Sequence, residues 1–160
     1  EGDSAQALLD KGADVIAMHQ DSTAAGEKAE AAGARWVSYN SDMSAFAPNA
    51  FLTAPVWDWG PRYVEIIEAA KAGTYKPDSY WGSMADGVVD IADIAADVDA
   101  GVKAAVADKK AAIIAGNFHV FSGPINDQDG HLVVAAGETM DDGSMLGMDF
   151  FVEGVIGSTG

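Results

Sequence analysis

Three short apolar runs, each followed at once by polar or aromatic residues, dominate the first sixty positions of the chain. The runs are Asp14–Met18, Arg35–Tyr39 and Phe51–Val56. Each has the length of a strand, and a nearly continuous apolar run is typical of a parallel strand covered on both faces. We therefore predict three strands, the first of them buried on both sides.

The segment between the first two runs predicts a helix. Residues 22–32 are rich in Ala, Glu and Lys, start with Ser22 and Thr23 as possible N-caps, and are followed by Gly33. Glycine commonly ends a helix in the left-handed conformation. A strand, a helix and a strand at this spacing indicate a parallel βαβ unit with a right-handed crossover.

Two longer helices are predicted downstream, over residues 60–72 and 99–116, and Pro61 suits the first turn of the earlier one. Each carries apolar residues at helical spacing, which we expect to pack inward. These residues are Tyr63, Ile66, Ile67 and Ala70 in the first helix and Val102, Val106, Ile113 and Ile114 in the second.

The pattern changes after residue 117. Residues 118–125 and 131–134 read as two strands joined by a turn that contains Asp129 and Gly130, a strong hairpin signal. The predicted fold class is α/β, an open and mostly parallel sheet with helices on both faces plus a carboxyl-terminal β-hairpin extension. The predicted domains are an α/β lobe over 1–117 and a hairpin and tail over 118–160.

Composition excludes several classes of function. The formal charge is −16, with nine basic against twenty-five acidic residues, whereas nucleic-acid binding needs clustered Lys and Arg. The absence of cysteine excludes disulfides, thiolate metal sites and thiol catalysis. No run of about 18 apolar residues predicts a transmembrane helix.

Polar and aromatic side chains stand where the predicted strands end. Because ligands bind at the carboxyl ends of parallel strands, we expect these side chains to open onto one rim. Carboxylates and amides beside aromatic rings suit a neutral polar ligand with flat faces. The alternative is that His19 and Asp21 cap the next helix and that Trp57 fills the core. The predicted ligand-binding residues are His19, Asp21, Asn40, Asp42, Trp57 and Trp59.

Catalytic chemistry is less well supported by the sequence. His19 and Asp42 with Ser22 or Ser41 would complete a Ser-His-Asp triad, but the chain lacks the Gly-x-Ser-x-Gly elbow. A metal site from His19, Asp21 and Asp42 lacks any recognised ligand spacing. A glycine-rich phosphate loop is also missing, which disfavours nucleotides relative to nucleosides.

A calcium loop is the other metal site that the sequence suggests. Asp127, Asp129 and Gly130 resemble part of such a loop, but the bidentate glutamate expected about six residues after the glycine is absent. Turn chemistry explains the motif better. We therefore predict no catalytic residue, no metal and no cofactor.

Six blocks of the sequence resemble successive motifs of one protein family. The chain is similar to the basic membrane protein family, which comprises substrate-binding proteins of ABC importers with the type I periplasmic-binding fold. The blocks occur in family order over nearly the whole chain. They are residues 12–22, 39–43, 56–60, 80–89, 118–125 and 151–155.

The resemblance implies two α/β lobes that close on a ligand, and a complete member about twice as long, of which this chain is the carboxyl-terminal half. Characterised members bind purine nucleosides or related compounds. His19, Asn40 and Trp57 match positions of ligand contacts in this fold. The nucleoside-binding branch has Asp-x-Asp where this chain has Asn40-Ser-Asp42, and lysine where it has Trp57, which favours a flat base such as adenine.

The function implied by the resemblance is that of a binding subunit without catalysis, acting with an ABC permease. Such a protein is expected to be a monomer in the periplasm or anchored on the outer side of the inner membrane. One alternative is an α/β hydrolase or transferase acting on nucleosides, with Asp21 or Asp42 as the base. Another is a ligand-sensing module of a receptor or transcriptional regulator.

Overall fold

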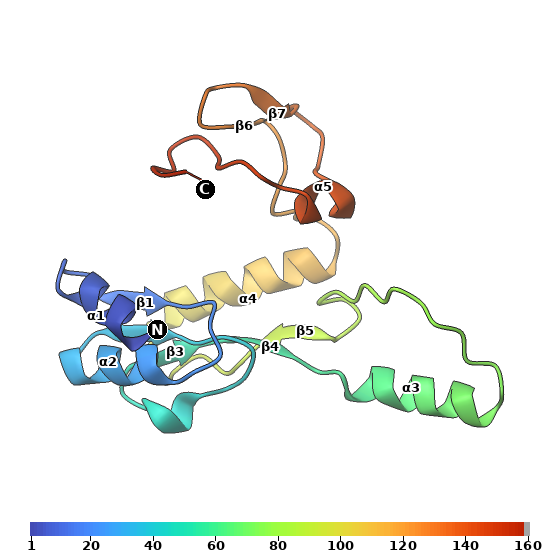
Figure 1. Ribbon diagram of the computed structural model, residues 1–160, viewed down its shortest axis with the longest axis horizontal. Helices are drawn as coiled ribbons and strands as arrows, with labels where there is room; N and C mark the ends of the chain where they lie inside the picture. The colour runs from blue at the N-terminus through green and yellow to red at the C-terminus, as the bar shows by residue number, and fades with distance from the viewer. Residues whose placement is uncertain (159–160) are drawn as a thin grey trace. The chain divides into compact units, whose positions relative to one another are not determined.

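A computed structural model describes residues 1–158, so the last two positions of the predicted 118–160 segment lie outside the described residues. The chain divides into two units, one that ends at Ile114 and one that begins at Ala115. The predicted domain boundary after residue 117 stays a prediction. Figure 1 shows the elements in chain order, from the amino-terminal helices to the hairpin.

A parallel sheet forms the centre of the first unit. Its strands β1 (Val15–Ala17), β2 (Arg35–Val37) and β3 (Phe51–Thr53) lie in the order β1-β2-β3. Ile16 pairs with Trp36 in parallel register, and Trp36 pairs with Phe51. The three predicted strands and the βαβ unit are therefore confirmed.

The helix α2 (Ala24–Ala32) packs against β1 and β2, and α1 (Gly2–Leu9) packs against α2. The indole of Trp36 is fully buried against α2 at Gly26, where an added Cβ would lie 2.3 Å from the ring. This close approach requires glycine. Gly33 ends α2 with a φ of 70°, as predicted.

The prediction that β1 is buried on both faces is wrong. Ile16 is 4% exposed, whereas Val15 is 46% exposed. Successive side chains of a strand point to opposite faces. The Ile16 side faces the cluster that includes Ala5 and Ala25, and the Val15 side lies open in the described chain.

The predicted strand Phe51–Val56 is in fact two strands in different sheets. After β3, Ala54 is fully buried and its carbonyl accepts a hydrogen bond from the Ala92 N–H at 2.8 Å. The chain then enters β4 (Pro55–Trp57), which pairs antiparallel with β5 (Val89–Ile91). Sequence hydrophobicity does not distinguish one strand from two, because both segments are apolar.

Both long helices form, as α3 (Gly60–Lys71) and α4 (Ala100–Ile114), but the prediction that their apolar faces pack inward is wrong. Every residue of both helices is at least partly exposed; Tyr63 is 60% and Val102 is 53% exposed. Helical spacing reports which residues share a face. It does not report whether a partner covers that face.

The second unit contains an antiparallel hairpin of β6 (Ile125–Asn126) and β7 (Leu132–Val134), and a short helix α5 (Asp142–Leu146). The predicted first strand over 118–125 is wrong in its extent, because the chain before Ile125 forms turns and one isolated bridge at Ser122. The tail pairs with the hairpin through an isolated bridge between Asp127 and Val152. The observed mixture of helices and a parallel sheet confirms the predicted α/β class. Over residues 1–158, no helix combines the length and the apolar character needed to cross a membrane.

Candidate functional site

Several predicted site residues lie together beyond the ends of β1, β2 and β4. His19 and Asp21 follow β1, Asn40 follows β2, and Trp57 is the last residue of β4. Because β1 and β2 are parallel, their carboxyl-terminal ends lie side by side at the same end of the sheet. The β4 strand brings Trp57 to the same end of the sheet, where it contacts Asn40.

A chain of two hydrogen bonds connects three of these side chains. The indole Nε1–H of Trp57 donates to Oδ1 of Asn40 at 2.6 Å. The Nδ2 of Asn40 in turn donates to Oδ1 of Asp21 at 2.7 Å. The amide thus joins the aromatic ring to the carboxylate.

A second set of contacts connects His19 to the same indole through Tyr39. The His19 Nε2 and the Tyr39 hydroxyl are 2.7 Å apart, and their rings meet edge to face with centroids 4.3 Å apart. The Tyr39 and Trp57 rings are 6.3 Å apart at an interplanar angle of 86°. Our sequence analysis did not select Tyr39, although an aromatic residue just after β2 was a usable signal.

A tight turn after β2 places Asn40. Its φ is 67°, a left-handed value that asparagine tolerates better than most residues. The Ser41 N–H donates to the Tyr39 carbonyl across it at 2.9 Å, which closes a three-residue γ-turn. The fully buried Ser38 supports this turn by donating its hydroxyl to the Ser41 carbonyl at 3.2 Å.

The resulting surface, formed by His19, Asp21, Tyr39, Asn40 and Trp57, is called the indole wall below. Trp57 is 38% exposed, and His19 and Asp21 are exposed. An exposed ring can stack on a flat ligand, and a carboxylate accepts hydrogen bonds. The wall therefore suits a flat ligand that carries N–H or O–H donors.

Asp42 takes no part in the hydrogen bonds of the indole wall within the described residues. Its carboxylate accepts the backbone N–H of Ser44 at 2.9 Å, in the loop that leads into the 3-10 helix η1 (Ser44–Phe46). Hydrogen bonds from the Ser44 side chain and backbone lower the pKa of Asp42. Asp42 lines a hollow of about 750 Å³, together with residues that include Phe51 and Asp97.

Trp59 also lies outside the hydrogen-bonded group. Its ring meets Tyr80 edge to face at 6.2 Å. The guanidinium of Arg62 lies 4.6 Å above the Tyr80 ring and forms ion pairs with Glu65 and Asp78. Trp59 is thus part of an aromatic and charged cluster at the start of α3.

The structure does not support the alternative interpretation, in which His19 and Asp21 cap the next helix and Trp57 fills the core. The N-cap residue of α2 is Thr23, whose hydroxyl donates to Glu27 at 2.6 Å, so His19 and Asp21 do not cap this helix. The tryptophan in the core is Trp36, whereas Trp57 reaches the surface.

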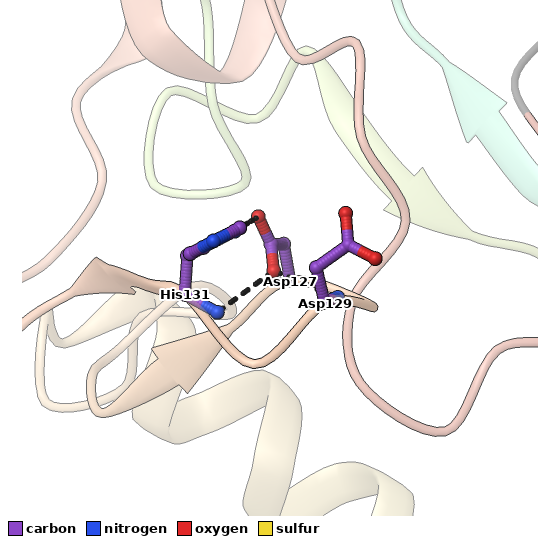
Figure 2. Close-up of side chains that lie close together, drawn as sticks. All are labelled: Asp127, Asp129 and His131. Carbon is purple, nitrogen blue, oxygen red and sulfur yellow. Dashed lines mark hydrogen bonds and ion pairs between the residues drawn. The ribbon is translucent and has the colours of Figure 1, made fainter.

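Asp127, Asp129 and His131 form the group of carboxylate and imidazole side chains close enough to share a metal ion within residues 1–158 (Figure 2). Both carboxylate oxygens of Asp127 already make contacts within the hairpin turn. Its Oδ1 accepts the backbone N–H groups of Asp129 and His131, each at 2.9 Å, and its Oδ2 lies 3.0 Å from His131 Nδ1. The bond from the His131 backbone is the main cause that lowers the pKa of Asp127. These contacts agree with the predicted turn chemistry.

Comparison with known proteins places the first unit in a transport family. A family model for ABC transporter substrate-binding proteins, PnrA-like, matches residues 1–118. The chain is 42% identical over 155 residues to a purine-binding protein of Brucella abortus, covering 97% of this chain and 44% of that protein. It is 34% identical to a Haloferax volcanii protein provisionally named as an ABC transporter glucose-binding protein, covering 97% and 37%. The chain therefore spans less than half the length of both relatives.

Two solved structures share the fold. A transcriptional activator of the comK gene from Bacillus halodurans aligns with a TM-score of 0.65 at 19% identity, over 74% of this chain and 42% of that one. An ABC transporter solute-binding protein from Conexibacter woesei aligns with a TM-score of 0.57 at 21% identity, over 74% and 41%. At such identities the likeness concerns the fold alone.

Proposed function

Because the chain belongs to the family of PnrA-like ABC transporter substrate-binding proteins, we propose that it forms part of the binding component of a bacterial ABC importer. The ligand is a purine base or nucleoside, held in a cleft between two lobes. The observation that carries this proposal is the exposed Trp57 indole held beside the Asp21 carboxylate. The purine-binding relative from Brucella abortus supports the ligand class.

Each residue of the indole wall has a distinct part in the proposal. Trp57 stacks on the purine ring. Aromatic stacking on a base contributes about 1–3 kcal/mol to the free energy of binding. Asp21 accepts a hydrogen bond from a ring or exocyclic N–H, or from a sugar hydroxyl. His19, held by Tyr39, and Asn40, bonded to Trp57 and Asp21, fix the orientation of the ligand. Asp42 and Trp59 stay predicted contacts, although they lie outside the hydrogen-bonded group.

The proposed transport cycle relies on lobe closure. Closure of two lobes by a hinge motion buries the ligand and creates the surface that the membrane permease recognises. The protein acts as a monomer outside the cytoplasm, in the periplasm or anchored to the outer side of the inner membrane.

Native mass spectrometry of the complete protein as purified tests the ligand class. We expect a co-purifying mass equal to that of a purine base or nucleoside, and micromolar or tighter binding of that compound by calorimetry. Glucose, named for the Haloferax volcanii relative, is the comparison ligand. Tight binding of glucose and none of any purine would overturn the proposal.

Product analysis distinguishes the proposed binding protein from a nucleoside hydrolase or transferase. A binding protein returns its ligand unchanged, so incubation with a nucleoside leaves its amount constant by chromatography. Release of free base in proportion to protein concentration would favour the enzyme. The ligand-sensing interpretation shares the proposed binding site and differs in the partner that the closed form recognises.

A further inference from the structure

Asn40 uses both ends of its amide inside the indole wall. Its Oδ1 receives the Trp57 indole and its Nδ2 donates to Asp21. Asn40 is half-buried, whereas Trp57 and Asp21 are exposed on either side of it. Each polar atom of the amide thus has a partner within the protein, which fixes the orientation of the side chain.

The chemistry of the two partners determines how the amide is oriented. An indole N–H is a donor only, so the amide oxygen must face Trp57. An ionised carboxylate is an acceptor only, so the amide nitrogen must face Asp21. The position therefore needs one donor and one acceptor on a short side chain, which asparagine supplies and aspartate, ionised, does not.

The backbone requires a residue that accepts a positive φ at the same place. The γ-turn holds Asn40 at a φ of 67°, and the buried Ser38 hydroxyl supports that turn. Asparagine and glycine are the residues that adopt such angles most readily. Both the backbone and the side chain of Asn40 are thus held by neighbours rather than left free.

We propose that Asn40 is a positioning residue that holds the Trp57 ring and the Asp21 carboxylate in register, and that through them it selects flat ligands with N–H donors over anionic ones. The inference rests on the proposed function and refines its ligand class. The second oxygen of Asp21, Oδ2, has no hydrogen-bond partner within residues 1–158 and accepts the donor of the ligand. An anionic ligand, such as a nucleotide phosphate, is repelled by the same carboxylate.

The variant Asn40→Asp tests the donor and acceptor requirement in the complete protein. At pH 8 the new carboxylate lies beside the carboxylate of Asp21. The two like charges repel each other, which destabilises the arrangement of side chains in the indole wall. We expect purine affinity about 10-fold or more weaker there, the loss of roughly one charge-assisted hydrogen bond.

Other ionisable groups near this position require a matched control. His19 and Tyr39 belong to the wall and Asp42 is two residues from Asn40, so the affinities of the variant and the wild type are compared at the same pH. Asn117→Asp adds the same charge at an exposed position of the second unit and should follow the wild type. An Asn40→Asp affinity equal to that of the wild type would overturn the inference.

A spectroscopic readout keeps the inference testable apart from ligand binding. Asn40→Gly retains the positive φ but removes the amide, and we expect it to fold and to shift the Trp57 indole N–H signal in a proton–nitrogen correlation spectrum. An unchanged indole signal would contradict the positioning role. If the wild type binds no purine while this signal moves, the proposed ligand class fails and the positioning role stands.

Discussion

The indole N–H of Trp57, the last residue of β4, donates to the side-chain oxygen of Asn40, which follows β2, at 2.6 Å. An indole N–H can only donate and an amide oxygen accepts, so the two residues interact through a neutral hydrogen bond. This contact joins the aromatic surface to the turn after β2 without placing a charge between them.

Replacement of Trp57 by alanine should weaken purine binding. Loss of stacking on the base costs about 1–3 kcal/mol, or roughly 5- to 150-fold in Kd. Calorimetry with the complete protein measures the change. Trp81→Ala removes another exposed indole, 59% exposed, that contributes nothing to the indole wall, and should leave Kd unchanged. Equal losses in both variants would show that the effect is not specific to the wall.

Replacement of Gly26 by alanine should destabilise the first unit. The added Cβ would lie 2.3 Å from the Trp36 ring, and that ring is fully buried. Overpacking of this kind costs about 1–3 kcal/mol, offset in part by the better helix propensity of alanine. Urea unfolding followed by tryptophan fluorescence measures the loss. Gly2→Ala, whose Cβ would lie an ordinary 3.5 Å from Ala24, should not lower stability.

The ion pair between Arg35 and Asp97 should contribute to acid sensitivity. The hydrogen bond from Arg35 lowers the pKa of Asp97 below its ordinary value of 3.8. A lowered folded-state pKa means that the contribution is complete above the ordinary pKa and is lost as the pH falls through the lower folded value. The effect is small and salt-sensitive, because the Asp97 side chain is 63% exposed.

Asp97→Asn tests this contribution through the urea midpoint between pH 7 and pH 2. Its midpoint should lie below that of the wild type at neutral pH and fall less steeply below pH 4. Asp108→Asn removes the same charge from an exposed position of α4 and should retain the wild-type slope. A parallel slope for Asp97→Asn would argue against the ion pair as a source of acid sensitivity.

Asp127 should be essential for the hairpin turn of the second unit. Asp127→Ala removes the acceptor for the Asp129 and His131 amides, so their hydrogen exchange should become faster. Asp129→Ala retains that acceptor and should change the exchange of the His131 amide little. Since both oxygens of Asp127 serve the turn, added Ca²⁺ should leave these exchange rates unaltered, and strong protection by Ca²⁺ would instead indicate a metal site.

Local sequence signals predicted the secondary structure well where one property decides the outcome. Gly33 ended a helix because glycine adopts positive φ readily, and Asp129-Gly130 predicted a hairpin for the same reason. The split of residues 51–57 into β3 and β4 was missed, because both strands are apolar and the change of partner at Ala54 leaves no mark in the hydrophobic pattern.

The sequence by itself determined the α/β class, the parallel strand, helix, strand order and the polar residues at the strand ends, because these depend on periodicity and turn chemistry along a short stretch of chain. The tertiary structure alone decided which of those residues meet. It joined Asp21, Asn40 and Trp57 into one hydrogen-bonded group, added Tyr39 beside it, and gave Asp42 and Trp59 contacts outside that group. These contacts join residues 17 to 20 positions apart and depend on strand pairing, which no local pattern encodes.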